Sequence, residues 1–224
     1  MKPWIPQLLS LNAGYVDTAG FLALQGLFTA HVTGNFVTLG AALVQGSSGV
    51  VAKLLALPVF CAVIVLARLA TGSMDATGGA PVRAMMVAKL VLLTLGAILA
   101  ITFGPFQQGD SLGAIVTGMV LVSAMAIQNA LSRIHLATSP PTTLMTGSTT
   151  QLMIDVADLL RGAGGDAAAA TRARLRKTSS VIAVFAIGCA LGATVFHFMA
   201  TWCFALPPLL ALVATVDALA SPQA

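Results

Sequence analysis

The hydrophobic pattern of the chain consists of long apolar runs separated by short polar segments. Six runs have the length of membrane-spanning helices: 5–24, 50–70, 84–103, 112–132, 179–202 and 204–219. Because a bilayer helix needs about 20 mostly apolar residues, each run is predicted to cross the membrane once. The last run is the shortest, and Pro207 and Pro208 fit the first turn of its helix rather than the middle.

Two further segments, 25–46 and 133–160, are too apolar for ordinary loops and are rich in Thr, Gly and Pro. Each contains a Thr-Gly pair followed by a polar residue: Thr33, Gly34 and Asn35 in the first, and Thr146, Gly147 and Ser148 in the second. The order of span, Thr-Gly segment, span, span therefore occurs twice, which is typical of transporters and channels. We predict a single transmembrane domain of two repeats, at about residues 1–105 and 110–224.

The positions of the basic residues favour one of two topologies. If both Thr-Gly segments cross the membrane, there are eight crossings and the basic residues scatter over both sides. If both segments dip in and return, six crossings remain, both termini are cytoplasmic, and every basic residue except Lys53 lies on the cytoplasmic side. We therefore predict an all-α integral membrane protein with six transmembrane helices and two re-entrant or broken half-helices in an inverted 3+3 repeat.

Composition supports a membrane location. The chain is 58% hydrophobic and only 8% charged, whereas soluble domains carry about 25% charged residues. The net charge of +4 then reports orientation in the membrane rather than nucleic-acid binding. Residues 161–177 are predicted to form an exposed linker that leads into a cationic helix start against anionic headgroups. The partners we expect are the lipid bilayer of the cell inner membrane and, since so small a bundle has few helices to enclose a site, a second copy in a homodimer.

The Thr-Gly segments carry the candidate chemistry. In each, an extended stretch leads to a helix near Thr33 or Thr146, where the threonine hydroxyl is a good N-cap. Non-helical backbone at membrane depth is stable only where it is buried in protein or lines a water-filled cavity. The free N–H groups at the starts of the two short helices would attract an anion or a polar solute into such a cavity. The predicted solute-binding residues are Thr33, Gly34, Asn35, Thr146, Gly147 and Ser148, with Gln128 and Asn129 of the fourth span. The alternative is that these groups satisfy one another and seal a tight helix crossing.

Ionisable residues at membrane depth supply the second candidate function. Asp17 lies inside the first span, where a lone charge is costly, so it is either a proton carrier or cation ligand, or an acceptor for nearby backbone groups. A histidine titrates near neutral pH in ordinary surroundings, so His31, like Asp17, is a candidate for gating or proton coupling, and the alternative is a capping or packing histidine. Gly188 and Gly192 form a Gly-xxx-Gly motif, which is typical of closely packed helices. The two helices belong either to one chain or to two protomers. Nothing in the sequence indicates a nucleophile with its base, a metal site or a cofactor site, so no enzyme activity is predicted.

Several motifs resemble one known family. They are Ala13-Gly14-Tyr15-Val16-Asp17 followed by Phe21, Ala30-His31-Val32-Thr33-Gly34-Asn35, Gln128-Asn129-Ala130, and Thr143-Leu144-Met145-Thr146-Gly147. Across most of its length the chain is similar to the YoaK-type membrane proteins, which are of unknown function, and the resemblance implies a multi-pass inner-membrane protein. The leading hypothesis is a small transporter or channel for an anion or small polar solute, with its site at mid-membrane between the two Thr-Gly half-helix N-termini. The alternative is a membrane scaffold or sensor with a polar structural core.

Overall fold

A computed structural model describes residues 2, 4–72, 74, 79–137, 139–162 and 164–220. Helices make up most of this part of the chain, and no strand occurs in it. The elements are α1 (Ile5–Ala23), α2 (Gly34–Gln45), α3 (Val50–Gly72), α4 (Ala80–Phe103), α5 (Leu112–Ile134), α6 (Met145–Leu160), α7 (Gly165–Met199), the 3-10 helix η2 (Ala200–Ala205) and α8 (Leu206–Ala220).

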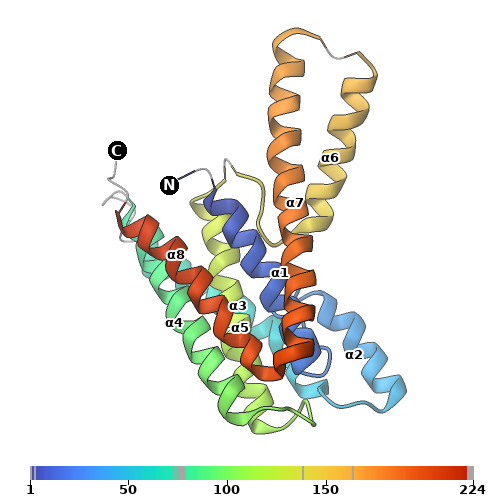
Figure 1. Ribbon diagram of the computed structural model, residues 1–224, viewed down its shortest axis with the longest axis vertical. Coiled ribbons are helices and arrows are strands. Elements are labelled where there is room, and N and C mark those ends of the chain that lie inside the picture. The colour runs from blue at the N-terminus through green and yellow to red at the C-terminus, as the bar shows by residue number, and fades with distance from the viewer. Residues whose placement is uncertain are drawn as a thin grey trace.

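All six predicted spans are helical, as α1, α3, α4, α5, α7 and α8. Within the described residues, four stretches are long and apolar enough to cross a membrane: Val50–Gly72, Ala80–Phe103, Leu112–Ile134 and Gly165–Ala220. The fourth contains α7, η2 and α8, and the chain reverses its direction at η2 (Figure 1). α1 is not among the four, because Asn12 and Asp17 lower the hydropathy of this 19-residue helix.

The spans pack into one bundle in which α1 begins and α8 ends at the same end (Figure 1). α1 packs mainly against α7, α3 against α5, and α4 against both α5 and α8. The contact of α1 with α7 is close because a Cβ atom at Gly188 would lie 2.2 Å from Leu11 O, and one at Gly192 would lie 2.7 Å from Tyr15 O. The Gly-xxx-Gly motif therefore joins two helices of one chain.

The two short helices, α2 and α6, begin in the middle of the molecule and run towards opposite ends (Figure 1). α2 packs on α3, and α6 packs on α7. The predicted threonine caps are wrong. Thr33 precedes α2 but already has helical backbone angles and makes no side-chain cap, while α6 begins at Met145, so that Thr146 lies inside its first turn.

α7 is much longer than predicted. It runs unbroken for 35 residues from Gly165, or about 52 Å, whereas the hydrocarbon core of a bilayer is about 30 Å thick. The predicted linker within 161–177 is thus largely helical, because its four consecutive alanines, residues 167–170, are the best helix formers. The first part of α7 forms with α6 a hairpin that projects beyond the rest of the bundle (Figure 1).

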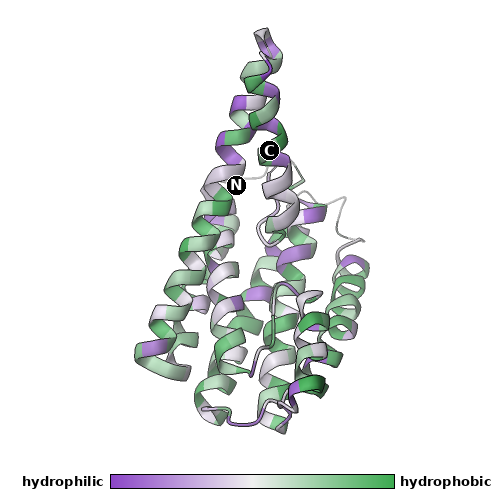
Figure 2. Ribbon diagram, turned by 90° about the vertical axis from the view of Figure 1, so that its right-hand side faces the viewer, coloured by the Kyte–Doolittle hydropathy of each residue, from purple (hydrophilic) through white to green (hydrophobic). Residues whose placement is uncertain are grey.

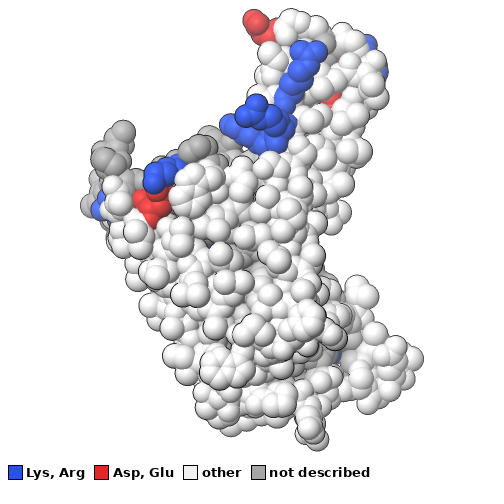
Figure 3. Space-filling model, viewed as in Figure 1, with Lys and Arg blue, Asp and Glu red and all other residues white. Residues whose placement is uncertain are grey.

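The sides of the bundle are largely apolar, and charged side chains gather at one end (Figure 2, Figure 3). Large hydrophobic side chains are exposed along α2, α3, α4 and α8, among them Val37, Val44, Leu69, Ile98 and Val213. Figure 2 shows hydrophobic positions along the bundle, with hydrophilic positions recurring in its upper extension. In the face shown by Figure 3, Lys and Arg side chains gather in the upper part and the body below is almost uncharged. Such a surface is stable only where lipid replaces water.

Candidate functional site

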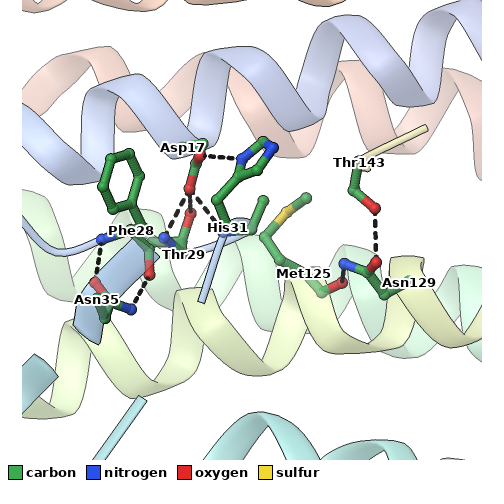
Figure 4. A network of polar contacts seen from close by, with 9 residues as sticks. Asp17, Phe28, Thr29, His31, Asn35, Met125, Asn129 and Thr143 are labelled. Atoms are coloured by element: carbon green, nitrogen blue, oxygen red, sulfur yellow. Dashed lines mark hydrogen bonds and ion pairs between the residues drawn. The ribbon is translucent and has the colours of Figure 1, made fainter. Parts of the chain in front are cut away.

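Asp17 is the centre of a buried hydrogen-bond network, which we call the Asp17 site (Asp17, Thr29, Ala30 and His31; Figure 4). Its Oδ1 accepts hydrogen bonds from Thr29 N at 2.8 Å and Ala30 N at 2.7 Å, and a longer one from Thr29 Oγ1 at 3.3 Å. His31 Nδ1 lies 2.7 Å from Asp17 Oδ2. The carboxylate therefore holds the loop between α1 and α2 against α1 and satisfies backbone groups that no helix pairs there.

Asn35 closes the same loop in the way that Thr33 was expected to. Its Oδ1 accepts a hydrogen bond from Phe28 N, and its Nδ2 donates one to Phe28 O, both at 2.8 Å. Asn35 is buried and Thr33 is exposed. A carboxamide can donate and accept at once, so it pairs with both backbone groups of Phe28, which a hydroxyl of threonine length at position 33 does not reach.

His31 borders an open cavity of about 490 Å³. Since Asp17 Oδ2 can only accept, the Nδ1 of His31 must donate to it, and this leaves Nε2 for a proton or a solute. The other walls are mainly apolar and come from α1, the loop and α7: Thr18, Phe21, Leu22, Phe28, Phe185, Cys189 and Ala193. The site thus combines one polar ring atom with a largely apolar surface.

A second network, the Asn129 site (Gln128, Asn129, Thr142 and Thr143), holds the loop before α6 against α5. Thr143 Oγ1 donates to Asn129 Oδ1 at 2.6 Å, and Asn129 Nδ2 donates to Met125 O at 3.1 Å (Figure 4). Gln128 Nε2 donates to Thr142 Oγ1 and to Leu9 O, each at 2.9 Å. Polar side chains of α5 therefore tie down the backbone that precedes the second short helix.

The two networks share one spacing. Asp17 bonds to His31 and Asn129 bonds to Thr143, in each case fourteen residues later and just before a short helix. Asp17 of α1 and Asn129 of α5 thus occupy corresponding places relative to the two short helices. What the sequence did not indicate is that the partners of these two residues would also correspond.

Gly147 and Ser148 of the second Thr-Gly segment border a different cavity. It measures about 560 Å³ and lies between α6, α7 and the loop before α6, with Gly147, Ser148, Arg133 and Lys177 among its lining residues. Ser148 is buried, whereas Thr146 and Gly147 are exposed. The cavity with Asp17 and His31 has a separate set of lining residues, so the two helix starts do not share either of these cavities.

Two contacts of acidic side chains, one in the hairpin and one at the start of α3, were not predicted. Arg174 binds Asp155 through two hydrogen bonds, of 2.8 and 2.6 Å, and this guanidinium lowers the pKa of Asp155 although burial opposes the change. Burial would raise the pKa of Asp110, but the backbone N–H groups of residues 49–52 together bring it below its usual value. Both contacts join residues far apart in sequence, and only the presence of isolated acidic residues indicated them.

Lys89 also differs from its predicted place. The topology counted it among the cytoplasmic basic residues, but its side chain is 1% exposed inside the bundle. Its only sequence signal was its position within the predicted span 84–103.

Among the described residues, no three His, Cys, Asp or Glu side chains are grouped so that they could hold a metal ion.

Apolar helices of spanning length and an apolar outer surface define this chain as a multi-pass helical membrane protein. The chain belongs to the family described as "Protein of unknown function (DUF1275)", whose model matches residues 5–216. It is also similar to the UPF0700 transmembrane protein YoaK of Bacillus subtilis (strain 168), with 41% identity over 71 residues. That match covers 31% of this chain and 32% of the relative. The YoaK-type resemblance is thus confirmed, and no solved structure matches the chain significantly.

Proposed function

We propose that this protein is a small transporter or channel that moves an anion or a small polar solute across the membrane. The observation that carries the proposal is the pair of matched networks, Asp17 with His31 and Asn129 with Thr143, each at the start of a short helix. Broken helices at membrane depth, one from each half of the chain, are the arrangement by which many transporters build a solute site.

The repeat that we propose is inverted and consists of three spans and one half-helix in each half. The packing pattern supports it. If α1 corresponds to α5, α2 to α6, α3 to α7 and α4 to α8, then the contact of α1 with α7 has its counterpart in that of α5 with α3. The contact of α2 with α3 likewise corresponds to that of α6 with α7. An inverted repeat also explains why α2 and α6 run towards opposite ends (Figure 1).

We propose that the protein lies in the inner membrane. The end of the bundle at which α1 begins and α8 terminates would face the cytoplasm. The basic side chains of the hairpin, Arg172, Arg174, Arg176 and Lys177, lie at this end, as the positive-inside rule requires (Figure 3). The cavity with Arg133 and Lys177 then opens on the cytoplasmic side, where it would attract anions. We propose no catalytic step, and a homodimer remains a prediction.

Flux through proteoliposomes tests the proposal directly. The probes are chloride, formate and phosphate as anions and glycerol as a neutral polar solute. At least one probe should enter faster than into protein-free liposomes, and Asn35→Ala and Thr146→Ala should each slow its entry. The matched control is Thr150→Ala, one turn further along α6, where the hydroxyl only bonds to Thr146 O.

Two results would contradict the proposal. If none of the four probes enters faster than in protein-free liposomes, the protein does not move this class of solute. If a probe enters and both variants carry it at the wild-type rate, the two helix starts are not part of its path. The first result, combined with a loss of thermal stability in Asn35→Ala, would favour the membrane scaffold as the function.

A further inference from the structure

Lys89 is a buried amine without a partner. Its side chain lies within α4 at 1% exposure, and in the described part of the chain its Nζ forms no hydrogen bond. A charged lysine at membrane depth needs a partner or water, so a lysine in such a place is a candidate functional group. Lys53, which is also buried, differs because its Nζ donates to Gln25 O at 2.7 Å and to Ser48 O at 3.2 Å.

Helix packing places Lys89 opposite Gln128. α4 and α5 are antiparallel, and a Cβ atom at Gly96 of α4 would lie 2.6 Å from the Leu121 side chain of α5. Lys89 comes seven residues before Gly96, and Gln128 comes seven residues after Leu121. Seven residues are almost two helical turns, so Lys89 and Gln128 lie on the facing sides of the two helices at the same level, about 10 Å from the Gly96 contact.

Gln128 has an acceptor that nothing in the described chain uses. Its Nε2 donates to Leu9 O, which can only accept, so the amide is oriented with Oε1 pointing elsewhere. Oε1 is buried and has no hydrogen-bond partner among the described residues. The helix register thus places a donor without an acceptor and an acceptor without a donor at the same helix interface, which is costly unless something brings them together.

The surrounding helices form a ring. α4 packs on α5 and α8, and both of these pack on α1. Asn12 on α1 contributes a second buried acceptor, Oδ1, that has no partner in the described chain, while its Nδ2 donates to Pro207 O of α8. The interior of this ring therefore contains carboxamide oxygens without donors, with which a cation or a protonated group can interact.

We infer that Lys89 is a proton-binding site inside the helical bundle and that the carboxamide oxygen of Gln128 accepts a hydrogen bond from its ammonium form. In the proton-free state the neutral amine is tolerated in apolar surroundings. On proton uptake, Nζ gains its third N–H and a rotation of the flexible side chain brings it to Oε1. The proton comes from water and returns to water, and no other bond changes.

The ionisable residues of the ring have other partners or lie near its ends. Asp217 of α8 forms an ion pair with Lys2, and Asp17 of α1 binds His31. Tyr15 of α1 donates to Cys203 O. Arg83 and Arg133 stand near the ends of α4 and α5 that lie at the hairpin end of the bundle. No ion pair to Lys89 occurs among the described residues, so neutral carboxamides rather than a carboxylate set its protonation.

This inference rests on the proposed function only for its role: in a transporter, Lys89 would be the group that couples solute movement to a proton. The Asp17 site was the earlier candidate, but the oxygens of Asp17 already accept hydrogen bonds from protein donors. A side chain that has no hydrogen-bond partners is better suited to gain and lose a proton than one whose hydrogen bonds are already formed.

The test is NMR of the full chain in detergent micelles with ¹³C at the ε-carbon of lysine, which yields only four side-chain signals because the chain has Lys2, Lys53, Lys89 and Lys177. Lys89→Met identifies the relevant signal by its loss. We expect that signal to report proton uptake as the pH falls from about 10 to about 6. Gln128→Leu should move its midpoint to lower pH, and Gln128→Glu should move it to higher pH by about one unit or more, because an opposite charge favours the ammonium form.

Thr117→Val is the matched control, since Thr117 is also a buried α5 residue whose hydroxyl has no partner in the described chain. It lies eleven residues before Gln128 and should leave the midpoint unchanged. The inference is overturned if the Lys89 signal does not change across this range, or if both Gln128 variants move it in the same direction, as a general loosening of packing would. A normal titration without any solute flux would overturn the proposed function alone.

Discussion

Arg174 on α7 and Asp155 on α6 form a two-bond ion pair, with 2.8 Å from Nε to Oδ2 and 2.6 Å from Nη2 to Oδ1. Gln151, one turn before Asp155, donates to the same carboxylate at 2.8 Å. The fork geometry matches guanidinium to carboxylate and fixes how α6 lies along α7. Because this contact is one of the few polar ones in the projecting hairpin, it determines the orientation of the second short helix.

Replacement of Arg174 by lysine should therefore loosen the hairpin although the charge is kept. An ammonium group cannot form the two parallel bonds, so Asp155 loses a partner in a buried position. We expect faster amide hydrogen exchange in α6 for Arg174→Lys than for Arg172→Lys, which changes an exposed basic residue two positions earlier. Equal exchange in the two variants would show that the ion pair does not hold α6.

Asp17→Asn should lower the stability of the purified protein by about 1 to 3 kcal/mol. Asparagine keeps an oxygen for Thr29 N and Ala30 N, but its NH₂ group then faces the donor nitrogen of His31. The double variant with Asp17→Asn and His31→Thr should recover part of the loss, since it recreates the Asn129–Thr143 pair. Thermal unfolding measures both, and a double variant no more stable than Asp17→Asn would argue against the equivalence of the two networks.

Asp110 caps the start of α3 from outside the helix. Its two oxygens accept hydrogen bonds from four backbone N–H groups, those of Gly49, Val50, Val51 and Ala52, at 2.8 to 3.2 Å. Loss of such a cap typically costs about 1 to 2 kcal/mol. We expect Asp110→Ala to lower Tm accordingly, and the exposed Asp166→Ala to leave it nearly unchanged.

The same carboxylate makes stability depend on pH. Its pKa in the folded protein is lowered, so the unfolded chain takes up the proton first, near pH 3.9. The stabilisation is therefore complete above about pH 4 and is lost as the pH falls further, through the folded pKa. Wild-type Tm should fall more steeply than that of Asp110→Asn in this acid range, and parallel curves would contradict this assignment.

Gly188→Ala should destabilise the bundle by about 1 to 3 kcal/mol or more. The added methyl group would lie 2.2 Å from Leu11 O, so α1 and α7 would have to separate. Gly40→Ala in α2 is the control, because a Cβ atom there meets nothing within 4 Å. A small effect at Gly188 would mean that the two helices are not packed as closely as described.

Much of the helical plan was readable from the sequence because hydrophobicity is a local property. The starts of α3 at Val50 and α5 at Leu112, and the prolines that open α8, follow from length, apolarity and helix-start chemistry. The early start of α7 was not predicted. Glycines and charges indicated a linker, but the alanine run between them and the packing against α6 extend the helix instead.

The sites were predictable only in part. Asp17, His31 and Asn35 were identified as candidates because polar groups at membrane depth are costly, and the structure brings them into adjoining networks. The threonine caps failed because a cap requires specific backbone angles, which the residue type alone does not determine. Asp155, Asp110 and Lys89 were missed or misplaced because their surroundings come from helices distant in the sequence.

The sequence by itself determined that this chain is a helical membrane protein and where most of its apolar helices lie, since these follow from the cost of exposing apolar groups to water and polar groups to lipid. Only the tertiary structure decided which side chains meet. The pairing of Asp17 with His31 and the burial of Lys89 depend on helix register and rotation. A rotation of one helix by a fraction of a turn would change those contacts without altering the hydrophobic pattern.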